Sequence, residues 1–183
     1  MGQNYSVMDY NKENMARTIG KSLPISFKQS VEICNFIRNK NVNYVKKVLS
    51  EVINQKLAIP FKRFNWDMGH KKGMAAGRYP KKASTEILNL INHVEANAQF
   101  KGLNTANLVV THIIANKASK AMHFGRKRSR EFKKTNIEIV VYEKATTKKP
   151  EKIKKDNKKS EQEKTIKQNK KLSEKGIVTK KEN

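Results

Sequence analysis

Hydrophobic residues recur at helical spacing in three stretches within the first hundred residues. In residues 25–39 an apolar stripe follows Ser26 and Gln29, whose spacing is typical of a capping box. In residues 41–60 a stripe of valine and leucine follows Asn41, a favourable N-cap residue. Both stretches therefore predict short amphipathic helices.

The third helical stretch, residues 79–103, is the longest. Pro80 stands at a first-turn position, where its missing N–H costs little, and Gly102 marks the end of the pattern. The apolar face between them carries Ile87, Ile91, Val94 and Ala98. This spacing predicts a long helix with one buried face.

After the third stretch the pattern changes from helical to extended. Residues 107–116 and 136–144 are short and rich in valine and isoleucine, which predicts two β-strands. About twenty residues separate them, too many for a tight turn, so we expect a projecting antiparallel hairpin that bends near Gly125. Residues 20–26 predict a third strand at a sheet edge, because Pro24 cannot donate to a ladder.

These elements predict an α+β fold, with three helices packed on a small antiparallel sheet of about three strands. We expect one domain over residues 21–143, with the long projecting hairpin at about 107–143. The polar, irregular residues 1–20 predict an N-terminal extension. Residues 144–183 are lysine-rich and hold too few apolar residues to fold alone, which predicts a disordered basic tail.

Composition adds a strong positive charge to this picture. The 183 residues include 40 Lys and Arg against 16 Asp and Glu, a formal net charge of +24. Repulsion among so many positive charges destabilises the folded chain unless a polyanionic partner supplies negative charge. Nucleic acid is the first candidate for this partner and an anionic membrane surface the second. The single cysteine excludes an intramolecular disulfide and a cysteine-rich zinc site, and indicates a reducing compartment.

The segment between the two predicted strands, residues 116–136, is strongly basic and contains Glu131 as its one acid. Its cations can donate to phosphate oxygens, and two aromatic rings can stack on unpaired bases. The alternative is a basic loop that merely faces solvent. The residues predicted to bind RNA here are Lys117, Lys120, His123, Phe124, Arg126, Lys127, Arg128, Arg130, Lys133 and Lys134.

A second basic region, residues 61–82, interleaves aromatic residues with cations, a composition that suits RNA. The alternative is that the aromatics are ordinary core residues, above all Phe61. No Gly-Lys-Ser/Thr follows at phosphate-loop spacing, which excludes an NTPase loop. The residues predicted to bind RNA here are Lys62, Arg63, Trp66, Lys71, Lys72, Arg78, Tyr79, Lys81 and Lys82.

Several short stretches stand in a characteristic order along residues 21–143: IPFKRFN, GRYPKK, HVEANAQFKGLN, HIIANKASK and IEIVVYEK. As an ordered set they resemble the large-subunit ribosomal protein L-twenty-two family, called L-seventeen in eukaryotes. GRYPKK and ANAQFKGLN are similar to its eukaryotic and archaeal branch. The resemblance implies a domain bound to large-subunit ribosomal RNA, whose hairpin lines the nascent-peptide exit tunnel.

The resemblance predicts a structural constituent of the large ribosomal subunit that clamps rRNA during assembly. Its expected partners are the rRNA, neighbouring ribosomal proteins and the nascent polypeptide. We expect a cytoplasmic location in the subunit, with nucleolar assembly if the cell is eukaryotic. No cofactor, no small-molecule substrate and no enzyme activity are expected, because the histidines are scattered and Cys34 lies on an apolar helix stripe.

Two other classes of protein are weighed against this prediction. The start MGQNYS fits a myristoylation pattern with Gly2 as acceptor and Ser6 at the expected position, and the lysine tail could supply a second membrane signal. A myristoylated polybasic membrane-surface protein is therefore the alternative. A DNA-binding module is less favoured, because basic residues crowd into loops and not onto one helix face.

Overall fold

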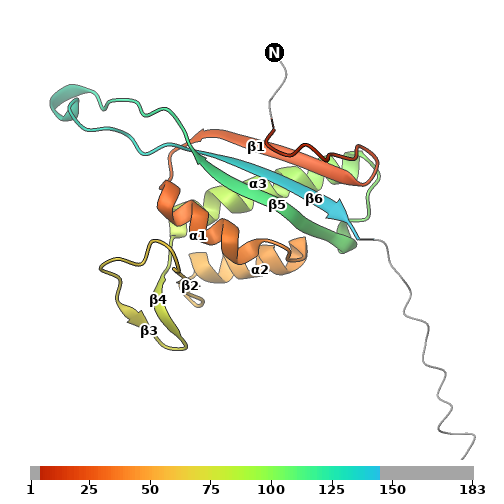
Figure 1. The fold of residues 1–183 in the computed structure, drawn as a ribbon, viewed down its shortest axis with the longest axis horizontal. Coiled ribbons are helices and arrows are strands. Elements are labelled where there is room, and N and C mark those ends of the chain that lie inside the picture. Colours follow the sequence, from red (N-terminus) through yellow and green to blue (C-terminus); the bar gives the residue numbers. More distant parts are fainter. Residues whose placement is uncertain (1–4, 145–183) are drawn as a thin grey trace, which may run out of the picture. The chain divides into compact units, whose positions relative to one another are not determined.

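The computed structural model describes residues 5–144 of the chain. Within them, three helices cover one face of a three-stranded antiparallel sheet, which confirms the predicted α+β fold (Figure 1). The helices are α1 (Phe27–Ile37), α2 (Val42–Ile53) and α3 (Lys81–Phe100). The sheet has the order β1-β6-β5 and comprises β1 (Met15–Leu23), β5 (Leu108–Lys117) and β6 (Thr135–Glu143).

Two predictions fall partly or wholly outside these residues. The lysine-rich tail predicted over 144–183 lies outside the described residues except for Lys144. Gly2, the acceptor of the myristoylation pattern, also lies outside them. No helix within residues 5–144 is long and apolar enough to cross a membrane.

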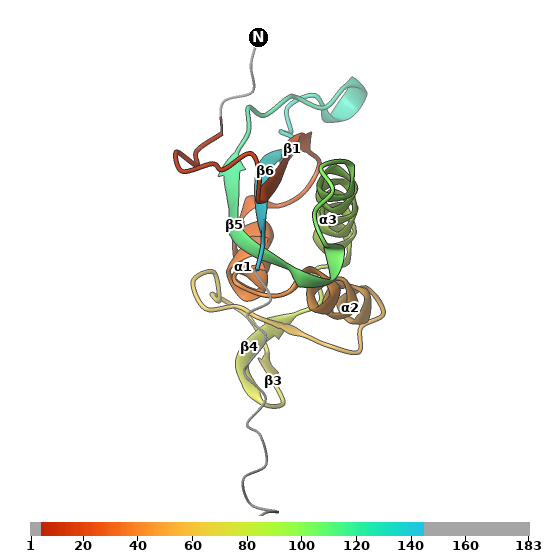
Figure 2. The same cartoon turned by 90° about the vertical axis from the view of Figure 1, so that its right-hand side faces the viewer.

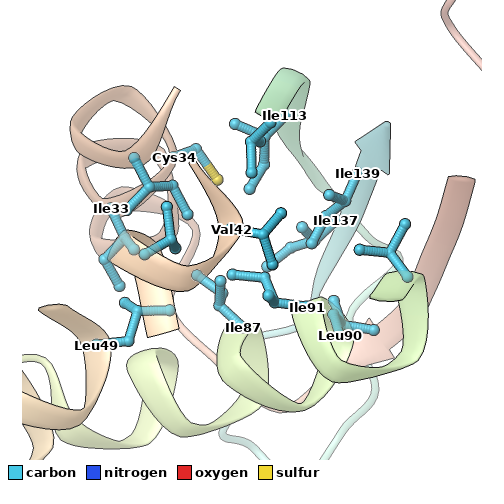
Figure 3. Close-up of a cluster of buried hydrophobic side chains, with 14 of the residues drawn as sticks. Ile33, Cys34, Val42, Leu49, Ile87, Leu90, Ile91, Ile113, Ile137 and Ile139 are labelled. Atoms are coloured by element: carbon cyan, nitrogen blue, oxygen red, sulfur yellow. The ribbon is translucent and has the colours of Figure 1, made fainter. Parts of the chain in front are cut away.

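The core forms between α3 and the sheet, with α1 and α2 completing the layer of helices (Figure 2). The four apolar positions predicted for the buried face of α3 are all fully buried, which confirms that pattern. In Figure 3, Ile91 of α3 lies near Ile137 of β6, and Ile87 and Ile139 belong to the same buried cluster. Burying each such side chain contributes about 1.5 to 3 kcal/mol, so this contact fixes the third helix on the sheet.

The helix starts follow the sequence signals at α2 and depart from them at α1. The Asn41 side chain accepts a hydrogen bond from the backbone N–H of Asn43, as an N-cap should. Ser26 precedes α1 but its side chain makes no capping hydrogen bond. The predicted capping box is therefore wrong, although α1 does begin directly after Ser26, whose carbonyl accepts from the N–H and the hydroxyl of Ser30.

The Asn41 cap yields a first prediction. Asn41→Ala should lower the free energy of unfolding by about 1 kcal/mol, because the N–H of Asn43 loses its acceptor and the carbonyl of Ala106 loses the hydrogen bond that Nδ2 of Asn41 donates. Urea denaturation followed by circular dichroism measures this change. Asn43→Ala is the matched control, since it removes a side chain that caps nothing and leaves the Asn41 hydrogen bond in place. An equal loss of stability in both variants would contradict the capping role.

Strand β1 differs from the prediction in position. It lies at the sheet edge, as expected, but runs from Met15 to Leu23 and pairs with β6, with a break in register between Gly20 and Leu23. The prediction that residues 1–20 form an irregular extension is therefore wrong for residues 15–20. This stretch has no clear alternation of apolar and polar residues, so its pairing with a strand far along the chain decides its conformation.

The other face of the main sheet is covered in part by the segment before β1. The backbone N–H and the hydroxyl of Ser6 donate to Oε2 of Glu138 at 2.9 and 2.6 Å, and the hydroxyl lies 3.3 Å from Nε2 of His112. Glu138 is consequently buried although it lies opposite the helices. Burial lowers the pKa of His112, partly offset by the nearby Glu138 carboxylate. The serine of the myristoylation pattern is thus bound to the sheet.

A second small sheet lies within residues 59–78, which cover the end of the second predicted helical stretch and most of the loop predicted over 61–82. Its strands, in the order β2-β4-β3, are β2 (Ile59–Pro60), β4 (Met74–Arg78) and β3 (His70–Lys71). A Cβ atom on Gly77 would lie 2.6 Å from Sδ of Met74 and 3.3 Å from the carbonyl oxygen of Ile59. Glycine therefore permits the close approach of β4 to β2.

Candidate nucleic-acid interface

The basic segment between β5 and β6 continues their pairing outward. Beyond the last strand pair, Lys117 opposite Thr135, backbone N–H groups of Ala118, Phe132 and His123 donate across the hairpin. The tip is a short 3-10 turn, Gly125–Lys127, in which Gly125 has a φ of +65°. Figure 1 shows the hairpin projecting beyond the layer of helices, as predicted.

The cations of this hairpin face solvent. Of the eight predicted to bind RNA, all but the half-buried Lys134 are exposed. Lys120 forms an ion pair with Glu131, and no other cation of the hairpin has an acidic partner among the described residues. The four at the tip, hereafter the tip cations, are Arg126, Lys127, Arg128 and Arg130. They are available to phosphate oxygens without first breaking a bond within the described residues.

The two predicted stacking residues of the hairpin differ in environment. Phe124 is 86% exposed, so both faces of its ring remain accessible. The His123 ring already stacks on Phe132, with ring centroids 3.6 Å apart and an interplanar angle of 24°. One face of His123 is therefore occupied within the hairpin, and Phe124 is the better stacking group for a base.

The aromatic loop, residues 61–82, separates into buried and exposed aromatics. Phe61 is buried, in agreement with the core alternative weighed for it, whereas Trp66 is 86% exposed. Phe64 packs edge-on against Phe27 of α1, with centroids 6.2 Å apart. The cations predicted here are exposed except Lys71, whose Nζ lies 5.4 Å from the Tyr79 ring centroid.

A buried carboxylate fastens this loop to α1. Glu32 is 2% exposed, and its Oε1 accepts hydrogen bonds from the backbone N–H groups of Arg63 and Phe64, both at 2.8 Å. Its Oε2 accepts from the N–H of Lys62 at 3.2 Å. Charge-assisted hydrogen bonds of this kind are strong, so Glu32 fixes the backbone of the loop at residues 62–64, which include two of its cations. The sequence prediction missed this residue.

The aromatic loop and the foot of the hairpin meet at one pocket. Its volume is about 480 Å³, and its lining includes Trp66 and Arg78 from the loop, Lys133 from the hairpin and Lys28 from α1. An adjoining groove of about 360 Å³ is lined by Phe27, Lys28, Lys117, Lys120, Lys133 and Lys134. The two regions predicted separately thus form one continuous basic surface, and Lys28 joins it as a residue that the prediction missed.

A further basic cluster holds the N-terminal segment. The Arg17 guanidinium lies 4.2 Å from the ring centroids of both Tyr5 and Tyr10. Nζ of Lys101 donates to the Tyr10 hydroxyl at 2.6 Å and to the carbonyl of Met15 at 2.8 Å. Because these contacts use the cations within the fold, the cluster serves to fix the segment before β1.

Comparison with known proteins matches the part of the chain that contains the fold and both basic regions. A family model described as "Ribosomal protein L22p/L17e" matches residues 18–142. The chain belongs to this ribosomal protein family. A relative from Archaeoglobus fulgidus, "Large ribosomal subunit protein uL22", is 39% identical over 75% of this chain and 94% of its own length. Relatives of the same name from Methanoculleus marisnigri and Methanosphaera stadtmanae are 42% and 40% identical, over 72% and 76% of this chain and 91% and 96% of their own lengths.

The L22p/L17e match confirms the family predicted from the ordered stretches, and its archaeal relatives agree with the predicted branch. The matched range contains both predicted RNA-binding regions and Glu32. The match does not test which of those residues contact RNA, so the individual contacts stay predictions.

Members of the L22p/L17e family are structural ribosomal proteins and not enzymes, which confirms the prediction that the chain is not an enzyme. The one cysteine fits this picture, because burial raises the pKa of the Cys34 thiol to about 12 and keeps it uncharged and unreactive at neutral pH. Among residues 5–144, no cluster of His, Cys, Asp or Glu could hold a metal ion.

Proposed function

We propose that the chain is a structural constituent of the large ribosomal subunit that binds and clamps large-subunit rRNA. The observation that carries this proposal is the continuous basic surface, in which the projecting hairpin and the aromatic loop meet at one pocket. The relatives, each named as a large ribosomal subunit protein, support it.

The clamp works through two basic arms of one compact unit, the hairpin and the aromatic loop. In Figure 1 the hairpin lies above α1 and the aromatic loop below it, and Lys28 in the first turn of α1 lines the pocket. Each phosphate that a cation neutralises releases counterions and adds to the affinity. Two arms that engage separate RNA segments hold those segments near one another, because both arms extend from the same packed core.

The hairpin end has a second role in this proposal. It lines the nascent-peptide exit tunnel, with cations toward the RNA and the exposed tip partly toward the growing polypeptide. Neighbouring proteins of the large subunit complete the surroundings. The protein acts in the cytoplasm within the subunit, and assembly takes place in the nucleolus if the cell is eukaryotic.

Co-sedimentation tests the proposal. The full chain should pellet with large subunits through a sucrose cushion after a high-salt wash, because many buried contacts survive salt that screens loose electrostatic attachment. A variant in which a two-residue Asn-Gly turn replaces residues 118–134 connects the paired residues Lys117 and Thr135 and removes the basic end of the hairpin. This variant should be retained less well by the large subunit. Release of the full chain to the top, or its fractionation with membranes, contradicts the proposal.

A further inference from the structure

The pocket between the aromatic loop and the hairpin foot is lined by two chemically different sets of side chains, called here its aromatic side and its polar side. Its aromatic side carries the exposed indole of Trp66 and the Phe64 ring, which is already held edge-on by Phe27. Its polar side carries Lys28, Arg78 and Lys133. No acidic residue lines it. A ligand that fits both sides is therefore an anion with a flat ring.

The aromatic side is available for stacking. Trp66 is 86% exposed, so most of its indole ring is not packed against the rest of the fold. Base–aromatic stacking tolerates every base, because each base has a π-face, and contributes about 1 to 3 kcal/mol per base. The backbone that positions this part of the loop is fixed nearby, at Arg63 and Phe64, by the Glu32 carboxylate.

The polar side is available for phosphate. Lys28, Arg78 and Lys133 take part in no ion pair among the described residues. Nζ of Lys28 lies 5.8 Å from the Phe64 ring centroid, so a cation already stands beside an aromatic ring. The lysine-lined groove shares Lys28 and Lys133 with the pocket, and offers a path for the sugar–phosphate chain on either side of the bound residue.

We propose that this pocket binds one unstacked RNA nucleotide, with the base against Trp66 and the flanking phosphates on Lys28, Arg78 and Lys133. The inference rests on the proposed rRNA binding and adds the form of RNA that the site selects. A pocket of about 480 Å³ has the size of a small-ligand site. A base inside a duplex cannot enter it, whereas a bulged or looped base can.

Trp66 is the only tryptophan of the chain, so its fluorescence reports on this pocket alone. The probes are short RNA hairpins with one bulged A, C, G or U, the same hairpin with an abasic bulge, and the fully paired hairpin. With the full chain, at least one bulged base should quench Trp66 fluorescence and bind about 5- to 100-fold more tightly than the abasic RNA. The paired and abasic RNAs should bind without this quenching.

Two variants decide whether the pocket is responsible. Trp66→Ala should remove the preference for a bulged base over the abasic bulge and leave binding to paired RNA unchanged. Phe100→Ala is the matched control, because Phe100 is a similarly exposed aromatic residue but lies at the end of α3, outside both predicted RNA-binding regions, so the preference should remain.

The remaining outcomes separate this inference from the proposed function. Equal binding of bulged, abasic and paired RNA without change in Trp66 fluorescence overturns the nucleotide pocket and leaves rRNA binding standing. Failure to bind any of the RNAs overturns both. Equal quenching by an acidic peptide, poly-glutamate, shows that the pocket selects negative charge and not a base, and also overturns the inference.

Discussion

A variant with glutamine in place of the four tip cations is expected to bind large-subunit rRNA about 10²- to 10³-fold more weakly at 0.15 M salt. Each cation that neutralises a phosphate contributes a slope of about 0.7 to 0.9 in a plot of log affinity against log salt. Losing four such contacts should therefore reduce the slope by roughly 3. Filter binding of the rRNA at several salt concentrations measures both quantities.

The control for this variant removes the same charge from elsewhere. Glutamine in place of four exposed lysines outside the proposed interface gives an identical net charge: Lys12, Lys40, Lys47 and Lys56. If the tip cations contact phosphate directly, the control should change the slope much less. Equal slopes in the two variants would mean that the RNA senses only total charge, and the hairpin would lose its assigned role.

The regular spacing of hydrophobic residues predicted those elements whose own sequence shows which face is buried. The apolar face of α3 is readable because Ile87 and Ile91 recur at helical spacing and are fully buried. Strand β1 was misplaced because residues 15–20 lack such a pattern, and pairing with β6 sets their conformation. The small sheet was missed because its strands are too short for a period of two and depend on the approach of Gly77 to Ile59.

The candidate site also has one part that the sequence predicts and one part that only the structure shows. The two clusters of lysine and arginine are visible in the sequence itself, because each cluster is continuous along the chain. The pocket does not show, because Lys28, Trp66 and Lys133 are far apart in the chain and meet only in the folded protein. Glu32 was read as part of a helix, and only the structure places its carboxylate against three backbone N–H groups.

Glu32→Gln is expected to weaken rRNA binding about tenfold even though it makes the protein more positive. The amide presents an NH₂ group where the carboxylate accepted from backbone donors, so some of the N–H groups of residues 62–64 lose their acceptor. Hydrogen bonds to a charged group contribute about 1.5 to 3 kcal/mol each, and the free energy of unfolding should fall by a comparable amount. Amide hydrogen exchange at residues 62–64 should quicken.

Asp67→Asn separates the role of Glu32 in positioning from its charge. Asp67 lies exposed in the same loop with a φ of +55°, a conformation that asparagine also tolerates, and this variant removes the same single negative charge. Its rRNA affinity should stay constant or rise slightly, because repulsion of phosphate decreases while the loop keeps its hydrogen bonds. Opposite signs in the two variants support positioning by Glu32. A rise of affinity in both would show that Glu32 acts through charge alone, and that the loop holds its course without it.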